Sequence, residues 1–490
     1  QGQVYGKFMH EAELFPGIAN FLHRCKRLNV KLFIVSHKTE FGHYDQENIS
    51  LRQAALEWMD INNFFEEKSF DISSESIFFS DTREEKVKKI LNLNLDAFVD
   101  DLIDVYKEPS FPSDVKKILF SRNLKIINSE NIDYCYSNWS QISDRLFGSP
   151  NTEDYLYWAQ AISKNKITNI SEIDGRGNSK IHRFTTNNGN SFALKAYPDR
   201  LIDPRNRIEA EFNACQFLEH TKRTHKAVNL DLNMNMAVFE WVEGNAIKNI
   251  EERHIDDALT FMALLWEKSK YLSPKDFPLA SEACLSADQL FSQVDGRFLK
   301  LKERAQYFDK LKSFLELNFE PVWTKTIEWA RNHWPKENIN STLPQKFRTI
   351  SPSDFGFHNA LERKDGSLCY LDLEYFGFDD PVKLITDFIW HPGMDLSNDQ
   401  KKFWIKEALK IFKKTENIRT RLFAAWPVIG LKWSLILLNE FLIDGWNKRV
   451  HAKKDIKELY FEKLDNQLIK ASEICKFIGS NNMQCPYIQL

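Results

Sequence analysis

The apolar residues of the first 125 positions follow two different periods. Short apolar runs typical of buried strands occupy residues 31–36, 76–80, 97–100 and 117–120. Apolar residues at helical spacing predict helices over residues 16–29, 50–61 and 84–93. Strands that alternate with helices indicate an α/β domain, in which a parallel sheet carries helices on both faces. In such a sheet, ligands bind at the carboxyl ends of the strands.

The pattern changes from strands to helices near residue 244. Residues 128–150 are polar, which predicts an irregular connection, and a helix is expected over 155–163. Residues 180–186 and 192–195 alternate like the strands of a hairpin around an Asn-Asn-Gly-Asn turn. Helical spacing then dominates residues 255–267, 288–301, 307–317, 321–333, 398–413, 419–444 and 455–478. We therefore expect a domain at 1–125, a linker at 126–150, a small lobe at 151–244 and a largely helical lobe at 245–490.

The length and composition of the chain favour some classes of protein and argue against others. With 490 residues the chain is too long for one ordinary domain, and its 43% of hydrophobic residues can form sizeable cores. The 66 basic and 69 acidic residues give a formal net charge of −3, so no positive footprint for nucleic acid is present. The seven cysteines are odd in number and form no C-x-x-C pair. This indicates reduced thiols in a cytoplasmic protein and argues against a zinc site or a disulfide framework.

No membrane-directing segment is expected. The chain opens at Gln1 with polar residues ahead of its first apolar run, unlike a signal peptide. Its most apolar stretch, residues 422–446, is interrupted by Pro427, Lys432 and Asp444. A membrane span needs about 20 apolar residues without such charges. The stretch therefore predicts a buried helix, and neither a membrane nor a nucleic acid is an expected partner.

Candidate catalytic residues lie between positions 351 and 380. Asp354 is followed after four residues by Asn359, and Asp372 and Glu374 come at the end of the next hairpin strand. Asp-x4-Asn is the catalytic-loop spacing of a protein-kinase-like phosphotransferase, in which the Asp accepts the proton of the acceptor hydroxyl and the Asn holds magnesium. Asp372 would hold the metal that bridges the nucleotide phosphates, with Glu374 as a further ligand. Phosphoryl transfer needs such groups because it depends on positioning and charge neutralisation.

Asp354-Phe355-Gly356 also spells DFG, the tripeptide that marks the magnesium loop of protein kinases. If it were that loop, a catalytic Asp-x4-Asn would lie upstream, but residues 332–342 contain no Asp. The order of the two acidic sites therefore makes Asp354 the base and Asp372 the metal ligand.

This stretch resembles the aminoglycoside phosphotransferase and choline kinase family, whose pattern is His-Gly-Asp-x4-Asn, a hairpin, Ile-Asp-Trp-Glu and a Gly-Asp-Pro turn. The matching segments are Pro352-Ser353-Asp354, Leu371-Asp372-Leu373-Glu374 and Asp379-Asp380-Pro381. Pro352 replaces the His that buttresses the loop in the family pattern. Leu384 stands where the family has its next Asp, and Asp387 follows one helical turn later.

The resemblance covers about residues 165–470. It implies an α+β bilobal protein-kinase-like fold with a helical C-lobe, Mg²⁺ as cofactor, and ATP or GTP as phosphoryl donor. It also implies a small-molecule acceptor, the hydroxyl of a sugar, polyol or amino alcohol.

The nucleotide-binding residues implied by the resemblance are Gly175, Gly177, Ser179, Lys195, Glu211, Glu240 and Val242. The glycines let backbone N–H groups close over the phosphates, and the lysine on the following strand neutralises their charge. Lys180 stands in place of the third glycine of the usual loop. The helix carboxylate of Glu211 would hold Lys195. Glu240 and Val242 lie in a hinge-like segment whose backbone would bind the edge of the adenine base.

A second candidate site lies in the first domain. Ser36 closes its first strand, Lys86 lies in the first turn of a helix, and Asp100-Asp101 close the third strand. A hydroxyl, a cation and two carboxylates at one end of a sheet would bind a phosphate with magnesium. Their order resembles the second, third and fourth motifs of the haloacid dehalogenase (HAD) superfamily, which implies a Rossmann-like parallel sheet. The alternative is that the two carboxylates merely cap a sheet edge.

The Asp-x-Asp motif that supplies the nucleophile of HAD phosphatases is missing, because the first Asp of the chain is Asp45. Either the chain has lost its first strand or the domain is a non-catalytic relic. We expect no phosphatase activity from this chain.

The leading hypothesis is a small-molecule kinase fused to a HAD-like domain. One alternative is a nucleotide-binding pseudoenzyme or scaffold, suggested by the missing HAD motif and by Pro352. Another is a HAD phosphatase truncated at its N-terminus, with the kinase-like part as a regulatory module. Magnesium-dependent nucleotide turnover separates these hypotheses, and the sequence indicates no particular oligomeric state.

Overall fold

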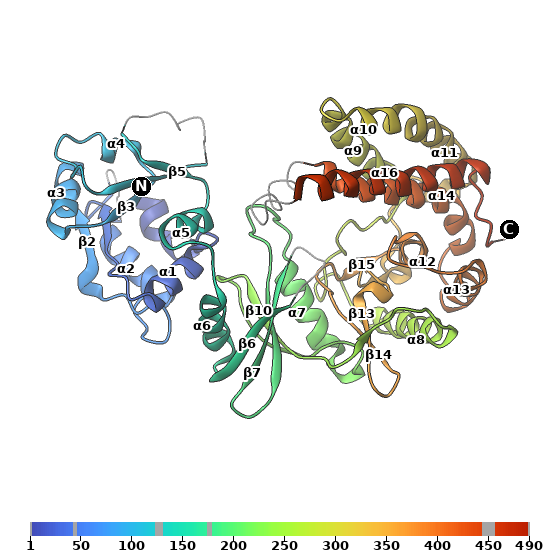
Figure 1. Ribbon diagram of the computed structural model, residues 1–490, viewed down its shortest axis with the longest axis horizontal. Helices are drawn as coiled ribbons and strands as arrows, with labels where there is room; N and C mark the ends of the chain where they lie inside the picture. The colour runs from blue at the N-terminus through green and yellow to red at the C-terminus, as the bar shows by residue number, and fades with distance from the viewer. Residues whose placement is uncertain (1, 43–46, 123–130, 174–178, 443–455, 489–490) are drawn as a thin grey trace. The chain divides into compact units, whose positions relative to one another are not determined.

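The computed structural model describes residues 2–42, 47–122, 131–173, 179–442 and 456–488. The chain divides into two compact units, whose helices and strands are labelled in Figure 1. The first unit comprises Gln1–Pro204 and Ala227–Trp241, and the second comprises Arg205–Lys226 and Val242–Leu490. The step from Trp241 to Val242 falls within the segment expected to be a hinge. The finer division into four segments stays a prediction.

The N-terminal segment of the first unit contains two small parallel sheets. Strands β1 (Ile34–His37) and β2 (Ile77–Ser80) form one, and β3 (Ala97–Asp100), β4 (Lys116–Phe120) and β5 (Tyr134–Tyr136) form the other in that order. The helices of this segment are α1 (Ile18–Arg27), α2 (Leu51–Ile61), α3 (Arg83–Leu93), α4 (Ile103–Tyr106) and α5 (Trp139–Phe147). Parallel strands were expected, but in one sheet. Among the described residues, no strand pairs with both β1 and β3.

The two parallel sheets nevertheless share a core. Val35 of β1, Phe98 of β3 and Leu119 of β4 belong to one cluster of buried residues, which also includes Ile90 of α3. Branched and aromatic side chains pack well on a pleated surface that a helix covers. The apolar runs of the sequence are therefore buried where the strand pattern predicted.

Part of the segment expected to be an irregular linker forms regular structure. It contains strand β5 and helix α5, whose first turn is capped by the Asn138 side chain. Ile142 of α5 is fully buried, and the Trp139 ring lies 5.0 Å from the Phe21 ring of α1. The three-residue strand is too short to show an alternating pattern, so the polar residues around it dominated the prediction.

An antiparallel sheet of five strands completes the first unit, in the order β6-β7-β8-β10-β9. Its strands are β6 (Ile167–Ile173), β7 (Lys180–Thr186), β8 (Ser191–Ala196), β9 (Ala227–Asp231) and β10 (Met236–Glu240). Helix α6 (Thr152–Ser163) contacts β6, β9 and β10. This arrangement confirms the expected hairpin over 180–195.

The parallel and antiparallel parts of the first unit are joined by a continuous apolar core. Phe21 and Ile142 from the N-terminal segment belong to the same buried cluster as Trp158 of α6 and Phe184 of β7. Ion pairs reinforce the junction, because Arg24 of α1 lies 3.2 Å from an oxygen of Asp154 in α6, and both side chains are almost fully buried. Removing one partner of a buried ion pair costs about 3–5 kcal/mol.

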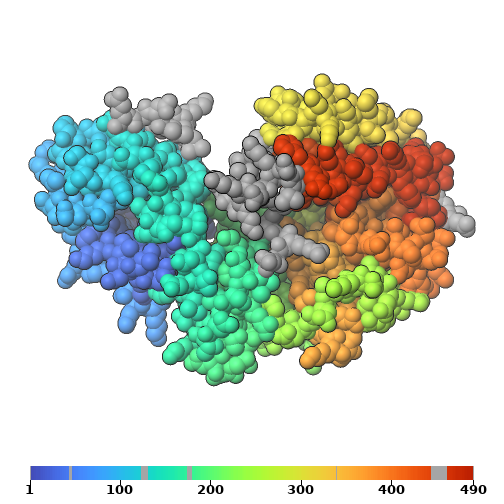
Figure 2. Space-filling view, viewed as in Figure 1, coloured from blue at the N-terminus to red at the C-terminus, as the bar shows by residue number. Residues whose placement is uncertain are grey.

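The second unit is mainly helical. Its helices are α7 (Arg207–Leu218), α8 (Glu252–Ser269), α9 (Ala287–Ala305), α10 (Asp309–Phe314), α11 (Glu320–His333), α12 (Pro381–Trp390), α13 (Asn398–Ile411), α14 (Ile418–Leu437) and α16 (Ile456–Ser480). They confirm the helices predicted from helical spacing, and α12 is a further helix that the spacing did not predict. Helix α14 packs against α9, α11, α12 and α16, and α16 lies beside α10 (Figure 2).

Two small antiparallel sheets in the second unit carry the acidic segments. One contains β11 (Asn245–Ala246), β13 (Ala360–Glu362) and β14 (Leu368–Tyr370), and the other pairs β12 (Thr349–Ser351) with β15 (Gly377–Asp379). The loop with Asp354 connects β12 to β13, and the segment with Asp372 connects β14 to β15.

One helical segment, Ile418–Phe441, is long and apolar enough to cross a membrane by length and composition. Within its most apolar window, 83% of the residues are buried inside the structure. A helix that is apolar on all sides and covered by other helices is typical of a protein core. The predicted buried helix is therefore confirmed.

Gly377 of β15 provides a test of the close packing of β15 against residues 278–280. A Cβ atom there would lie 2.5 Å from the Ala280 nitrogen and 2.6 Å from the Leu279 carbonyl carbon, both backbone atoms that cannot rotate away. We expect Gly377→Ala to destabilise the protein by about 2 kcal/mol or more, as overpacking does. Denaturant unfolding measures the change. Gly296→Ala in α9, where a Cβ meets nothing within 4 Å, is the control and should be neutral or stabilising. Equal losses in both variants would contradict the prediction.

Candidate active site

Asp354 lies in a tight loop held by its own backbone. Its N–H donates to the Pro352 carbonyl at 2.9 Å, and the Ser353 hydroxyl donates to the Ser281 carbonyl at 3.1 Å. Ser353 has a φ of +67°, in the left-handed region that non-glycine residues rarely adopt. Such a conformation persists only when its surroundings impose it, and it is frequent at functional sites.

The residue after Asp354 anchors the loop in the core. Phe355 is buried, and its ring lies 5.2 Å from the Tyr370 ring of β14 and 5.3 Å from the Phe388 ring of α12. The DFG sequence therefore places an aromatic anchor behind Asp354.

Asn359 connects the loop to the second acidic segment. Its side-chain amide donates to the Asp354 carbonyl at 3.1 Å, and its own carbonyl accepts from the Leu371 N–H at 2.8 Å. The second bond continues the pairing of β13 with β14, in which Ala360 is opposite Tyr370. The structure thus brings the predicted residues Asp354, Asn359 and Asp372 to one end of a single hairpin.

Three carboxylates gather beyond this hairpin, all in the second unit. Ligand oxygens of Glu211, Asp372 and Glu374 lie within 4.8 Å of one another. Asp372 has a φ of +61°, a second left-handed residue at the site. Such a set of oxygen ligands suits a hard divalent cation such as Mg²⁺. The resemblance predicted Glu211 as the partner of Lys195, and its proximity to the predicted metal ligands was not foreseen.

Two further residues, which were not predicted from the sequence, contact this cluster. Arg207 of α7 places its Nη1 2.5 Å from Glu374 Oε1, and both side chains are nearly fully buried. His225 Nε2 lies 3.6 Å from Glu211 Oε1. The guanidinium offsets one of the three negative charges, which makes a buried group of carboxylates less costly. No local signal in the sequence connects Arg207 with Glu374, because 167 positions separate them.

Two histidines contact the candidate base. His358 Nε2 lies 3.0 Å from Asp354 Oδ1, and His391 Nε2 lies 3.4 Å from the same oxygen. The two imidazole rings are stacked, with centroids 3.6 Å apart and an angle of 5° between their planes. His391 was not among the candidate site residues predicted from the sequence. His358 was missed, although its position one helical turn after Asp354 was a usable signal.

The surroundings of Asp354 favour its ionised form. Burial by itself raises its pKa, but the hydrogen bond and charge of His358, the charge that His391 carries when protonated, and the amide of Asn359 outweigh burial and lower it. Burial and repulsion from His358 lower the pKa of His391 to about 4. At neutral pH the site therefore combines a carboxylate with a neutral His391.

The turn that follows the acidic segment begins a helix. The Asp380 side chain accepts from the Val382 N–H at 2.9 Å, and Pro381 occupies the first helical position of α12. Lys383 is buried between Asp379 at 3.4 Å and Asp387 at 2.7 Å. Burial raises the pKa of Asp379 to about 6. These residues fix α12, which carries His391 at its end.

The residues predicted to bind the nucleotide are distributed over both units. Gly175 and Gly177 fall outside the described residues, and Ser179 directly precedes β7. Lys195 is buried in β8, with its Nζ 5.1 Å from the Tyr197 ring centroid. Glu240 is the exposed last residue of β10 in the first unit, whereas Val242 and Glu211 belong to the second. The pairing of Lys195 with Glu211 stays a prediction.

The HAD-like residues are partly brought together. Lys86 Nζ lies 2.5 Å from Asp100 Oδ2, and both side chains are buried. Burial and the neighbouring Asp100 raise the pKa of Asp101. Ser36 lies in β1, opposite Phe79 of β2. The resemblance to HAD proteins stays a prediction.

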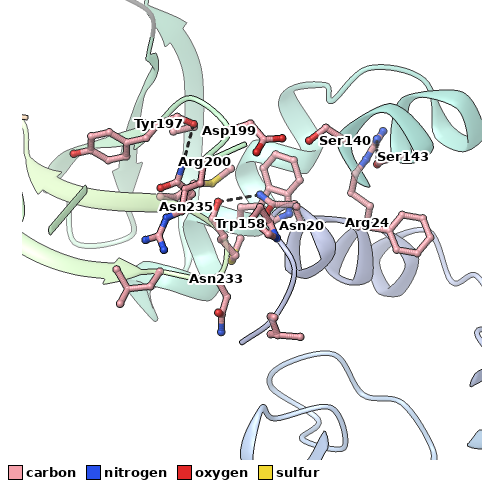
Figure 3. A pocket seen from close by; sticks show the side chains of 18 of the residues that line it. Asn20, Arg24, Ser140, Ser143, Trp158, Tyr197, Asp199, Arg200, Asn233 and Asn235 are labelled. Atoms are coloured by element: carbon pink, nitrogen blue, oxygen red, sulfur yellow. Dashed lines mark hydrogen bonds between the residues drawn. The ribbon is translucent and has the colours of Figure 1, made fainter. Parts of the chain in front are cut away.

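A cavity of about 580 Å³ lies in the first unit (Figure 3). Several of its polar side chains already have protein partners: Asn20 donates to the Met234 carbonyl at 3.2 Å, and Arg24 is paired with Asp154. None of the predicted site residues that the structure describes lines this cavity.

No family model and no curated protein matches the sequence. Among solved structures, the chain is similar to a choline kinase from Streptococcus pneumoniae, with 12% identity, a TM-score of 0.42, and coverage of 66% of this chain and 98% of that one. It is similar to a spectinomycin phosphotransferase in complex with ADP and spectinomycin, with 10% identity, a TM-score of 0.45, and coverage of 66% and 99%. It is also similar to an ethanolamine kinase from Plasmodium vivax, with 12% identity, a TM-score of 0.43, and coverage of 70% and 95%.

His391 generates a prediction about stability and pH. Because its pKa is lowered from 6.5 to about 4, the folded protein binds fewer protons at this residue than the unfolded chain between these values. Its contribution to stability is therefore full above pH 6.5 and is lost as the pH falls toward 4. We expect the parent to lose about 1–3 kcal/mol more than His391→Gln over this range. Urea unfolding at several pH values measures this difference, and parallel curves for both proteins would contradict it.

Proposed function

We propose that the chain is a kinase that transfers the γ-phosphoryl group of ATP or GTP to a hydroxyl of a small molecule. The observation that carries this proposal is the juxtaposition of Asp354, Asn359 and Asp372 at one end of the β13–β14 hairpin. A base and a cation site at this spacing are what in-line phosphoryl transfer requires.

In this proposal Asp354 orients the acceptor hydroxyl and accepts its proton on Oδ2, because both histidines contact Oδ1. Its lowered pKa keeps it ionised at neutral pH, ready to accept a hydrogen bond from the hydroxyl. The acceptor oxygen forms its bond to phosphorus while the bond from phosphorus to the bridging oxygen of the nucleotide breaks. The nucleoside diphosphate leaves with that oxygen.

Asp372 and Glu374, with Asn359 from the loop, are the residues that we assign to Mg²⁺. The three carboxylates within 4.8 Å, counting Glu211, fit a hard cation with oxygen ligands. Bound Mg²⁺ would neutralise charge on the transferring group. Arg207 holds Glu374 in place through their buried ion pair.

For the acceptor we propose a sugar, polyol or amino alcohol, on the strength of the motif resemblance around Asp354. For the N-terminal segment we propose a HAD-like domain, supported by the buried Lys86–Asp100 pair. All seven cysteines are free thiols, which supports a reducing compartment such as the cytoplasm.

Asp354→Asn tests the base. We expect turnover to fall by about 100-fold or more, with nucleotide affinity nearly unchanged, because only the proton acceptor is lost. Phosphorus NMR with ATP, Mg²⁺ and pooled sugars, polyols and amino alcohols detects the phosphorylated product. Asp365→Asn, an exposed aspartate in the turn of the same hairpin, is the matched control. Comparable turnover in Asp354→Asn and the parent would remove Asp354 from the mechanism.

Asp372→Asn tests the metal ligand. Replacing one anionic ligand should weaken the binding of ATP in the presence of Mg²⁺ and leave metal-free binding little changed. Titration calorimetry with and without Mg²⁺ separates the two. The same magnesium dependence in Asp372→Asn as in Asp365→Asn would contradict the assignment.

A further inference from the structure

Two imidazole rings surround the carboxylate of Asp354 and come from different elements. His358 belongs to the loop that carries Asp354, and His391 caps the C-terminus of α12. Both direct Nε2 at Asp354 Oδ1, and the rings lie nearly parallel at 3.6 Å. Pro352, two residues before Asp354, has no side-chain donor.

The hydrogen bonding of His391 determines where its proton lies. The Gly393 N–H donates to His391 Nδ1 at 3.0 Å. A ring nitrogen that accepts a hydrogen bond carries no proton, and a neutral imidazole has one proton, which must then lie on Nε2. The low pKa of His391 supports the neutral form. The Nε2–H group therefore faces the carboxylate.

Two glycines, Gly356 and Gly393, pack closely against the two imidazole rings. A Cβ on Gly393 would lie 3.0 Å from His391 Cε1 and 3.2 Å from His358 Cβ. A Cβ on Gly356 would lie 2.7 Å from the His358 ring and 2.9 Å from Met394 Sδ. The edge of Trp433 covers His391, with ring centroids 4.8 Å apart and planes at 81°. The orientation of both rings is thus set by close packing.

A transition-metal ion is the alternative use of these side chains, because ligand atoms of Asp354, His358 and His391 lie within 4.8 Å of one another. An imidazole binds a metal through a lone pair in the plane of its ring. With the rings 5° from parallel and 3.6 Å apart, one ion cannot lie in both planes. The stacked arrangement therefore favours hydrogen bonding to the carboxylate.

We propose that His391 is a positioning residue for Asp354. Its Nε2–H, fixed by the Gly393 N–H on the opposite nitrogen, donates to Oδ1 and holds the carboxylate so that Oδ2 faces the acceptor hydroxyl. His358 stacks against His391 and contacts the same oxygen. The catalytic part of this inference rests on the proposed role of Asp354 as base, whereas the tautomer does not.

The tautomer is tested on the full-length protein without substrate. Protein labelled with ¹⁵N-histidine is examined by long-range ¹H–¹⁵N correlation at neutral pH, and His391→Gln assigns the signal. We expect a neutral ring protonated on Nε2. A ring protonated on Nδ1, or a charged ring, would overturn the proposal, as would a shift of the His391 nitrogens with stoichiometric Zn²⁺.

The effect on Asp354 is tested by kinetics with the acceptor found by phosphorus NMR. We expect His391→Leu to lower kcat about tenfold or more with the KM for ATP unchanged, and His391→Gln, which keeps a donor, to recover part of the loss. Gly393→Ala should lower kcat in the same way, because its Cβ would displace the His391 ring, although no side chain that contacts Asp354 is replaced. His333→Leu, an exposed histidine of α11, is the control.

Failure of the inference and failure of the proposed function give different results. If Asp354→Asn is inactive but His391→Leu has the kcat of the parent, the positioning role is wrong and the kinase proposal stands. If Asp354→Asn keeps full turnover, the proposed base is wrong, and the positioning role of His391 falls with it.

Discussion

The hydrogen bond from the Leu371 N–H to the Asn359 carbonyl is the constraint on which the candidate site depends. It continues the β13–β14 pairing past the last paired residues and holds the loop with Asp354 beside the segment with Asp372. Because the same asparagine bonds the Asp354 carbonyl through its side chain, one residue connects the proposed base with the proposed metal ligands. Behind it, the Tyr370 ring is stacked on Phe261 of α8 at 4.5 Å, which fixes the hairpin against the helical core.

Helix α12 supplies the other half of the arrangement around Asp354. Asp380 caps its first turn and pairs with Arg421 of α14, and Trp433 of α14 donates to Asp387 at 2.8 Å. The length and direction of α12 then decide where His391 lies. A buried, charge-paired helix is rigid because any displacement would leave ionised groups without partners in a medium of low polarity.

The sequence predicted those parts of the site that are close together along the chain. Asp354, Asn359 and Asp372 lie on one hairpin, so their spacing carries the information. The helical period located α8, α9, α10, α11, α13, α14 and α16, but not α12. Arg207, Glu211 and His391 reach the site only through tertiary packing, which no local pattern encodes. The N-terminal strands were predicted from their apolar runs, but their division into two sheets depends on pairing between distant segments. Strand β5 and helix α5 were missed because polar neighbours obscured a very short strand.

The continuous core of the first unit has a consequence for the history of this chain. Phe21 and Ile142 pack in one cluster with Trp158 and Phe184, and the buried Arg24–Asp154 pair crosses the same junction. A domain that is merely appended to another can be lost or exchanged by recombination at the linker. Here such an event would expose a large apolar surface and leave a charge unpaired. We therefore expect the parallel-strand segment and the antiparallel sheet to unfold together as one cooperative unit.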